Sequence, residues 1–243
     1  MYTLIVPVAG AGKRMQSDIP KTLTMMNGRS LLSISTNSLM QFASKTILVT
    51  SSVHKEKILA EAIKSKLPNP TIVEQLFPNG TAFAVLQALK ITDTEIAIIV
   101  WGDHIGAEKF PIKNFINNFK NYESDVYLPI IEVKNPYVYF KIDKEKIIDF
   151  NETKKGAPFI NKGFSDVGVF CIKPKSILSK LEKWTNNNKD SDDLNFLSFF
   201  ASEISRSLRI KIIKLKDRSG MLSIGINSKL ELEAIIENKG KIK

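Results

Sequence analysis

The sequence predicts an α/β fold with a mixed, mostly parallel sheet flanked by helices. Short apolar runs alternate with helical patterns in the N-terminal part of the chain, and 43% of the 243 residues are hydrophobic. Such alternation favours parallel strand pairing, with helices on both faces of the sheet. No apolar run approaches the roughly 18 residues of a membrane span. A chain of this length can bury one large core, so we expect a single domain over residues 1–243.

The N-terminal elements follow a regular order. Apolar runs bounded by polar turns indicate buried strands, and apolar residues at helical spacing indicate amphipathic helices. The expected order is strand 3–9, helix 30–43, strand 46–50, helix 55–67, strand 71–75, helix 81–90 and strand 95–103.

After Lys113 the pattern becomes mixed rather than doubly wound. The stretch 186–193 is polar throughout and is expected to be a loop, too short to link two domains. The other expected elements are a helix at 114–119, strands at 125–133, 139–143 and 163–172, and helices at 176–184 and 194–204.

Composition and charge narrow the class of protein. The net charge of +10 and the pI near 9.5 permit an anionic partner, but the lysines are spread along the chain, which favours a generally basic surface. We find no zinc-finger spacing or helix-turn-helix signal and expect no nucleic-acid partner. The first residues lack the features of a signal peptide, so we expect a cytoplasmic protein without membrane contact. The only cysteine, Cys171, lies in an apolar run and is expected to be a packed thiol.

The first strand runs into a loop that is rich in small residues and cations. Residues 6–21 read VPVAGAGKRMQSDIPK and contain Lys13, Arg14 and Lys21. In open α/β sheets, ligands bind at the carboxyl ends of the strands, and the first strand-to-helix loop is a favoured phosphate site. This loop is therefore the first candidate for a binding site.

Two common phosphate motifs do not fit this loop. A dinucleotide fingerprint requires a third glycine where the chain has Met15, and a P-loop requires a glycine where it has Pro7 and a Ser or Thr directly after Lys13. What remains is a backbone cradle at Gly10 and Gly12 beside several cations. Such a cradle suits a triphosphate whose charge must be neutralised while a bond at phosphorus breaks.

Residues 9–23, AGAGKRMQSDIPKTL, resemble the signature of sugar-phosphate nucleotidyltransferases, in which Gly-x-Gly-x-Arg-Met runs on to Pro-Lys. Three further stretches extend the resemblance in the family's order: EQLFPNGTAFAVLQAL at 74–89, IIVWGDHIGAE at 98–108 and SIGINSKLELEAI at 223–235. The resemblance is strongest to the uridylyltransferase domain of N-acetylglucosamine-1-phosphate enzymes. It implies a Rossmann-like fold of the GT-A type, with a nucleotide-binding half at 1–110 and an acceptor-binding half at 111–243.

The resemblance also implies roles for individual residues. Catalytic roles fall to Arg14, Lys21 and Asp103, and nucleotide contacts to Ala9, Gly10, Gly12, Lys13, Gln75, Gly80 and Thr81. Acceptor contacts fall to Glu152 and Asp166, and Mg²⁺ ligation to Asp103 and Asn227. Gln75 can pair with a pyrimidine edge, Gly80 admits the base and opens the next helix, and the two oxygen ligands suit magnesium shared with phosphate.

The chain departs from the family at several positions. Val138 and Phe140 replace two glycines, Lys13 replaces a Thr or Ser, and Asp166 stands where acetylamido-sugar enzymes have asparagine. An ionised Asp accepts hydrogen bonds but donates none, which leaves the acyl-group specificity open. Hexapeptide repeats typical of an acetyltransferase domain are not found, so we expect no acetyl transfer.

The implied reaction is transfer of a nucleoside monophosphate from an NTP, UTP in the first instance, to a sugar-1-phosphate. Pyrophosphate would leave in line, with Mg²⁺ as the cofactor. One alternative is a cytidylyltransferase acting on a sugar phosphate, phosphocholine or methylerythritol phosphate, although the segment NGTAFAVLQAL favours the sugar-phosphate branch. A second alternative is a non-catalytic nucleotide-sensing module. His104 follows Asp103, and we expect it to contact the sugar or to order Asp103 rather than to act as a base.

Overall fold

The computed structural model describes residues 1–10, 19–77, 79–121, 123–217 and 220–239. The strands are β1 Tyr2–Pro7, β2 Met25–Met26, β3 Arg29–Ser30, β4 Ala43–Thr50, β5 Pro70–Glu74, β6 Ile96–Val100, β7 Val126–Lys134, β8 Val138–Asp143, β9 Lys146–Glu152, β10 Lys162–Asp166, β11 Val169–Ile172 and β12 Ile210–Leu215. The α-helices are α1 Leu31–Thr36, α2 Lys55–Lys64, α3 Thr81–Lys90, α4 Ile112–Asn121, α5 Pro174–Asn187, α6 Phe196–Phe199 and α7 Lys229–Lys239.

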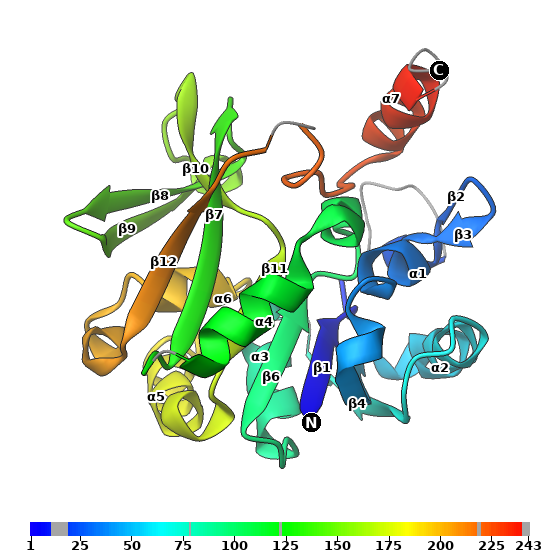
Figure 1. Cartoon of the computed structure of the whole chain (residues 1–243), viewed down its shortest axis with the longest axis horizontal. Coiled ribbons are helices and arrows are strands. Elements are labelled where there is room, and N and C mark those ends of the chain that lie inside the picture. The colour runs from blue at the N-terminus through cyan, green and yellow to red at the C-terminus, as the bar shows by residue number, and fades with distance from the viewer. Residues whose placement is uncertain (11–18, 78, 122, 218–219, 240–243) are drawn as a thin grey trace.

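One large mixed sheet carries both halves of the chain, as Figure 1 shows. Its order is β5-β4-β1-β6-β11-β7-β10-β8-β9, with β12 on β7. Strands β5, β4, β1 and β6 are parallel, whereas β11 is antiparallel to both β6 and β7. The predicted α/β fold with a mixed sheet flanked by helices is therefore confirmed. The parallel part lies in the N-terminal half, and most antiparallel pairs lie in the C-terminal half.

The central strands are apolar on both faces because helices cover both. Leu4 and Val6 pack in one cluster with residues of α2 and α4, whereas Ile5 between them packs in the other with residues of α3, α5 and α6. All three side chains are fully buried. Continuous apolar strands of this kind are expected where a parallel sheet is sandwiched between two helical layers. Among the described residues, no helix is long and apolar enough to span a membrane.

Several predicted boundaries were wrong. The helix expected at 30–43 ends at Thr36, and the helix expected at 194–204 is limited to α6, followed by a 3-10 turn at Glu203–Ser207. The strand expected at 163–172 is divided into β10 and β11 because Gly168 adopts a positive φ of 70° between them. The elements β9, β12 and α7 were not predicted. These differences matter because β10, α6 and the segment before α7 all contribute to the cavity described next.

Candidate functional site

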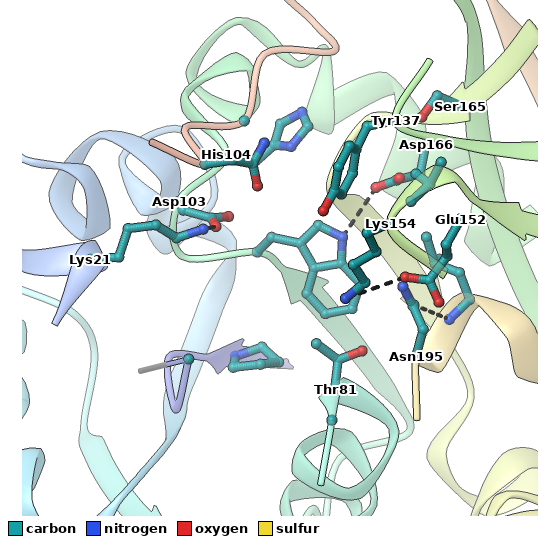
Figure 2. Close-up of a pocket in the computed structure, with 18 of the residues that line it drawn as sticks. Lys21, Thr81, Asp103, His104, Tyr137, Glu152, Lys154, Ser165, Asp166 and Asn195 are labelled. Carbon is teal, nitrogen blue, oxygen red and sulfur yellow. Dashed lines mark hydrogen bonds and ion pairs between the residues drawn. The ribbon is translucent and has the colours of Figure 1, made fainter. Parts of the chain in front are cut away.

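A cavity of about 760 Å³ opens at the carboxyl ends of β1 and β6 and extends to the C-terminal half of the sheet. Figure 2 shows side chains from both halves facing it. Of the residues implied by the resemblance, it is lined by Ala9, Gly10, Lys21, Gln75, Gly80, Thr81, Asp103, Glu152, Asp166 and Asn227. The other three, Gly12, Lys13 and Arg14, lie outside the described residues. One cavity thus brings together residues from Ala9 to Asn227, near the two ends of the sequence.

Lys21 and Asp103 form an ion pair on the cavity wall. Lys21 begins a 3-10 turn after Pro20, and Asp103 lies just beyond the end of β6. Both side chains are partly buried, with exposed fractions of 18% and 23%. Partial burial reduces solvent screening, so both charges remain available to an ionic ligand in the cavity.

Asn227 is held close to this pair by the backbone. The amide of Ile226 donates to the Asp103 carbonyl at 3.0 Å. Two hydrogen bonds fix the start of α7: the Glu231 amide donates to Ser228 Oγ at 3.2 Å, and the Asn227 amide donates to Glu231 Oε2 at 2.5 Å. Asp103 and Asn227 therefore offer a carboxylate and an amide oxygen at one end of the cavity. This donor set fits Mg²⁺, which prefers oxygen and usually keeps waters and phosphate oxygens as further ligands.

At one side of the cavity, the loop before α3 is joined to the loop before α6. The Leu194 amide donates to the Asn79 carbonyl at 2.9 Å, and the Ala82 amide donates to the Leu194 carbonyl at 2.9 Å. In addition, Thr81 Oγ1 accepts a hydrogen bond from the Phe196 amide at 2.9 Å. A Cβ on Gly80 would lie 2.3 Å from the Leu194 backbone. The glycine is therefore required by this close packing as well as by its φ of 104°.

Gln75 lies beneath the same loop and is 7% exposed. Its Nε2 donates to Asn79 Oδ1 at 3.0 Å and to the Gly80 carbonyl at 3.2 Å. Because the amide nitrogen makes both bonds, the side-chain oxygen is the group that remains to accept a hydrogen bond from a ligand.

In the C-terminal half of the cavity, Glu152 belongs to a cluster of charges that sequence reasoning missed. Glu152 is 6% exposed, and its carboxylate lies 3.4 Å from Lys154 Nζ and 3.0 Å from Lys155 Nζ. Lys154 Nζ also lies 2.5 Å from Asp193 Oδ2. Burial lowers the pKa of Lys154, but Asp193 and Glu152 more than offset this, so its pKa lies above the ordinary value. In the sequence these partners are about forty residues apart, and no local signal links them.

Asp166 ends β10 and is held by two neutral donors. Trp101 Nε1 donates to its Oδ2 at 3.1 Å, and the Gly168 amide donates to the same oxygen at 2.8 Å. Burial raises the pKa of Asp166, and the charge of His104 and the two hydrogen bonds oppose this only in part. His104 itself is buried between Gly168 and Gly225, and its Nε2 lies 2.9 Å from the Leu222 carbonyl. His104 nevertheless lines the cavity next to Asp103.

The fold and this cavity together define an α/β protein of the nucleotidyltransferase class. Residues 4–194 match the family described as the MobA-like NTP transferase domain. The chain belongs to this family of nucleotidyltransferase enzymes.

Individual relatives agree with this membership, and a solved structure shares the fold. A bifunctional GlmU protein of Buchnera aphidicola is 29% identical over 243 residues, which cover 96% of this chain and 50% of that protein. The chain thus spans about half the length of such relatives. A probable UDP-N-acetylglucosamine pyrophosphorylase of Acanthamoeba polyphaga mimivirus is 27% identical and covered over 91% of its length, with 93% of this chain aligned. The inositol-1-phosphate CTP transferase of T. maritima has the same fold, with a TM-score of 0.72, 21% identity and coverage of 99% and 96% of the two chains.

Proposed function

We propose that the protein transfers a nucleoside monophosphate from an NTP, with UTP as the first candidate, to a sugar-1-phosphate. The observation that supports this most is the arrangement of the cavity. The Lys21–Asp103 pair lies on its wall, with Gln75, Gly80 and Thr81 on the nucleotide side and Glu152 and Asp166 on the acceptor side. The name of one relative, a probable UDP-N-acetylglucosamine pyrophosphorylase, favours UTP and the phosphate of an N-acetylated aminosugar.

In this reaction an oxygen of the acceptor phosphate forms a bond to the α-phosphorus, and the bond from that phosphorus to the bridging oxygen breaks. The electron pair leaves with pyrophosphate. The attacking oxygen is already anionic at neutral pH, so no covalent intermediate and no general base are required. The protein's contribution is to hold two anions in line and to stabilise the developing charge.

Each side chain has a separate task in this proposal. Lys21 bridges the α-phosphate and the acceptor phosphate, and Arg14 holds the pyrophosphate. Asp103 and Asn227 would hold Mg²⁺, which would supply positive charge next to the phosphate oxygens. Ala9, Gly10, Gly12 and Lys13 line the triphosphate, and Glu152 accepts hydrogen bonds from acceptor hydroxyls.

The test is pyrophosphate release in the presence of Mg²⁺. UTP, CTP, dTTP and GTP are crossed with a panel of sugar-1-phosphates, phosphocholine and methylerythritol phosphate. Lys21→Ala and Asp103→Asn are expected to lower turnover on the order of a hundredfold or more, as removal of one preorganised charged group does. Lys90→Ala is the matched control, because Lys90 is also ion-paired, at 2.8 Å to Glu182, but does not line the cavity.

The alternatives give different results in the same experiment. Release with CTP and phosphocholine or methylerythritol phosphate would replace the proposal by a cytidylyltransferase. Nucleotide binding by calorimetry without release from any pair would favour a nucleotide-sensing module. Full activity of Lys21→Ala would remove Lys21 from the mechanism.

A further inference from the structure

Residues 193–196, called here the bridging segment, connect two parts of the cavity wall. The segment leads into α6, and its residues Asp193 and Asn195 line the cavity. Figure 2 shows Asn195 facing the cavity together with Glu152, the last residue of β9, and Lys154, from the turn that follows β9. The segment has contacts at each of its ends, and the two sets of contacts differ in kind.

Backbone contacts fix the bridging segment to the loop before α3. Leu194 donates to the Asn79 carbonyl and accepts from the Ala82 amide, each at 2.9 Å. Leu194 is buried, and its backbone leaves no room for a Cβ on Gly80. Gln75 in turn donates to the Gly80 carbonyl at 3.2 Å. Because packed groups of this kind transmit small displacements, a shift of the bridging segment would also shift this loop.

Charged contacts hold the first residue of the bridging segment. Lys154 Nζ lies 2.5 Å from Asp193 Oδ2, and Lys155 Nζ donates to the Asp193 carbonyl. Both lysines belong to the 3-10 turn after β9 and also pair with the buried carboxylate of Glu152. The side chains of Lys154 and Asp193 are 32% and 48% exposed, so solvent screens their attraction only in part. The two lysines thus connect Asp193 to Glu152.

From these contacts we infer that Asp193 is a positioning residue, which holds the loop 79–82 in place for the nucleotide through its ion pair with Lys154. The assignment of this loop to the nucleotide rests on the proposed function. Loss of the Asp193 charge leaves the backbone bonds of Leu194 intact but weakens the anchoring of the bridging segment. The loop should then open more often and bind a nucleotide less tightly. Since Lys154 also pairs with Glu152, the same ion pair links the part of the cavity proposed for the acceptor to the part proposed for the nucleotide.

Amide hydrogen exchange of the ligand-free protein, followed by mass spectrometry, tests the positioning itself. The decisive peptide contains Ala82, whose amide donates to the Leu194 carbonyl and which is far from Asp193 in the sequence. In Asp193→Asn this peptide should exchange about two- to fivefold faster, the effect expected from loss of a half-exposed ion pair. Lys154→Met removes the partner charge and should accelerate exchange of the same peptide. Peptides from β1 should exchange at the wild-type rate in both variants.

Two further variants serve as controls. Asp192→Asn makes the same chemical change one residue away, at an exposed side chain that does not line the cavity, and should leave the exchange of the Ala82 peptide unchanged. Asp193→Glu keeps the carboxylate and should retain most of the protection.

Nucleotide binding is measured by calorimetry with Mg²⁺ and a UTP analogue that cannot be cleaved between the α- and β-phosphates. Its Kd should rise by the same two- to fivefold in Asp193→Asn and remain unchanged in Asp192→Asn. Adding Asp193→Asn to Lys154→Met should weaken binding no further, because the ion pair is already lost.

Three results overturn the inference. The first is exchange of the Ala82 peptide at the wild-type rate in Asp193→Asn, and the second is an equal acceleration in Asp193→Asn and Asp192→Asn. The third is weaker nucleotide binding with unchanged exchange, which would make Asp193 a direct contact of the ligand. If analogues of UTP, CTP, dTTP and GTP all fail to bind the wild type, the proposed function fails, and exchange alone then decides whether Asp193 positions the loop.

Discussion

At the scale of single residues, the carboxylate of Asp125 is expected to make the free energy of unfolding depend on pH in the acid range. Asp125 Oδ2 accepts from the backbone amide of Arg209 at 2.9 Å and from its Nε at 3.4 Å. Burial raises the pKa of Asp125, but the hydrogen bonds and charge of Arg209 outweigh it and hold the pKa below its ordinary value. The stabilisation is therefore complete above the unfolded-state pKa of about 3.9 and is lost as the pH falls through the lower folded-state pKa.

We expect Asp125→Asn to lower the free energy of unfolding by about 1–2 kcal/mol at pH 7, since it weakens hydrogen bonds to a charged group. As the pH falls below about 4, the wild type should approach the variant. Urea unfolding between pH 7 and pH 3 measures this, with Asp143→Asn in β8 as an exposed control. A difference between wild type and variant that stayed constant over this range would contradict the assignment.

Individual site residues were predictable where they belong to a recognisable stretch of sequence. Lys21 and Asp103 follow strand ends within short motifs, and the structure brings both to one cavity. Lys154 and Asp193 gave no such signal, because their pairing depends on the approach of two loops that are distant in the chain. His104 was expected to contact the sugar or to order Asp103, and nothing in the sequence indicated that its ring is buried against Gly168 and bonded to the Leu222 carbonyl.

At the scale of elements, Gly80 couples the start of α3 to the loop before α6. We expect Gly80→Ala to be strongly destabilising for two reasons: a φ of 104° is costly for alanine, by about 1–3 kcal/mol, and the new Cβ would lie 2.3 Å from Leu194. Gly156→Ala is the control, because Gly156 has a φ of 87° but open space around its Cβ position. Thermal unfolding should show a larger loss of stability for Gly80→Ala. Equal losses would mean that the close approach to Leu194 adds nothing to the destabilisation.

Elements were predictable where burial gives a clear pattern. The strand β1 and the helix α3 have long apolar signals, and both were expected close to their observed bounds. The strand β9 was missed because it lies at the sheet edge, paired with β8 alone among the described strands, and its exposed and half-buried residues do not alternate regularly. The break between β10 and β11 was missed because the positive φ of Gly168 is set by contacts with His104 and Trp101, which are distant in sequence.

At the scale of the whole molecule, the single cysteine reports on opening of the sheet. Cys171 lies in β11 between β6 and β7 and is fully buried, in line with the packed thiol that the sequence predicts. Burial also raises the pKa of the thiol well above its ordinary value, so little thiolate forms near neutral pH. The thiol can react only when the strands of the two halves separate, because β11 joins the parallel strands to the antiparallel ones.

We therefore expect one thiol per chain to react at once with a thiol reagent in denaturant. In the native protein the rate of this reaction should be lower by about a thousandfold or more. Ser52→Cys is the control, since Ser52 is exposed and an added thiol there should react immediately under native conditions. An NTP with Mg²⁺ should slow native labelling of Cys171 further, because a ligand that binds only the folded state stabilises it. Native labelling as fast as that of the added cysteine would show that the sheet opens locally at β11 and that the two halves are not one cooperative unit.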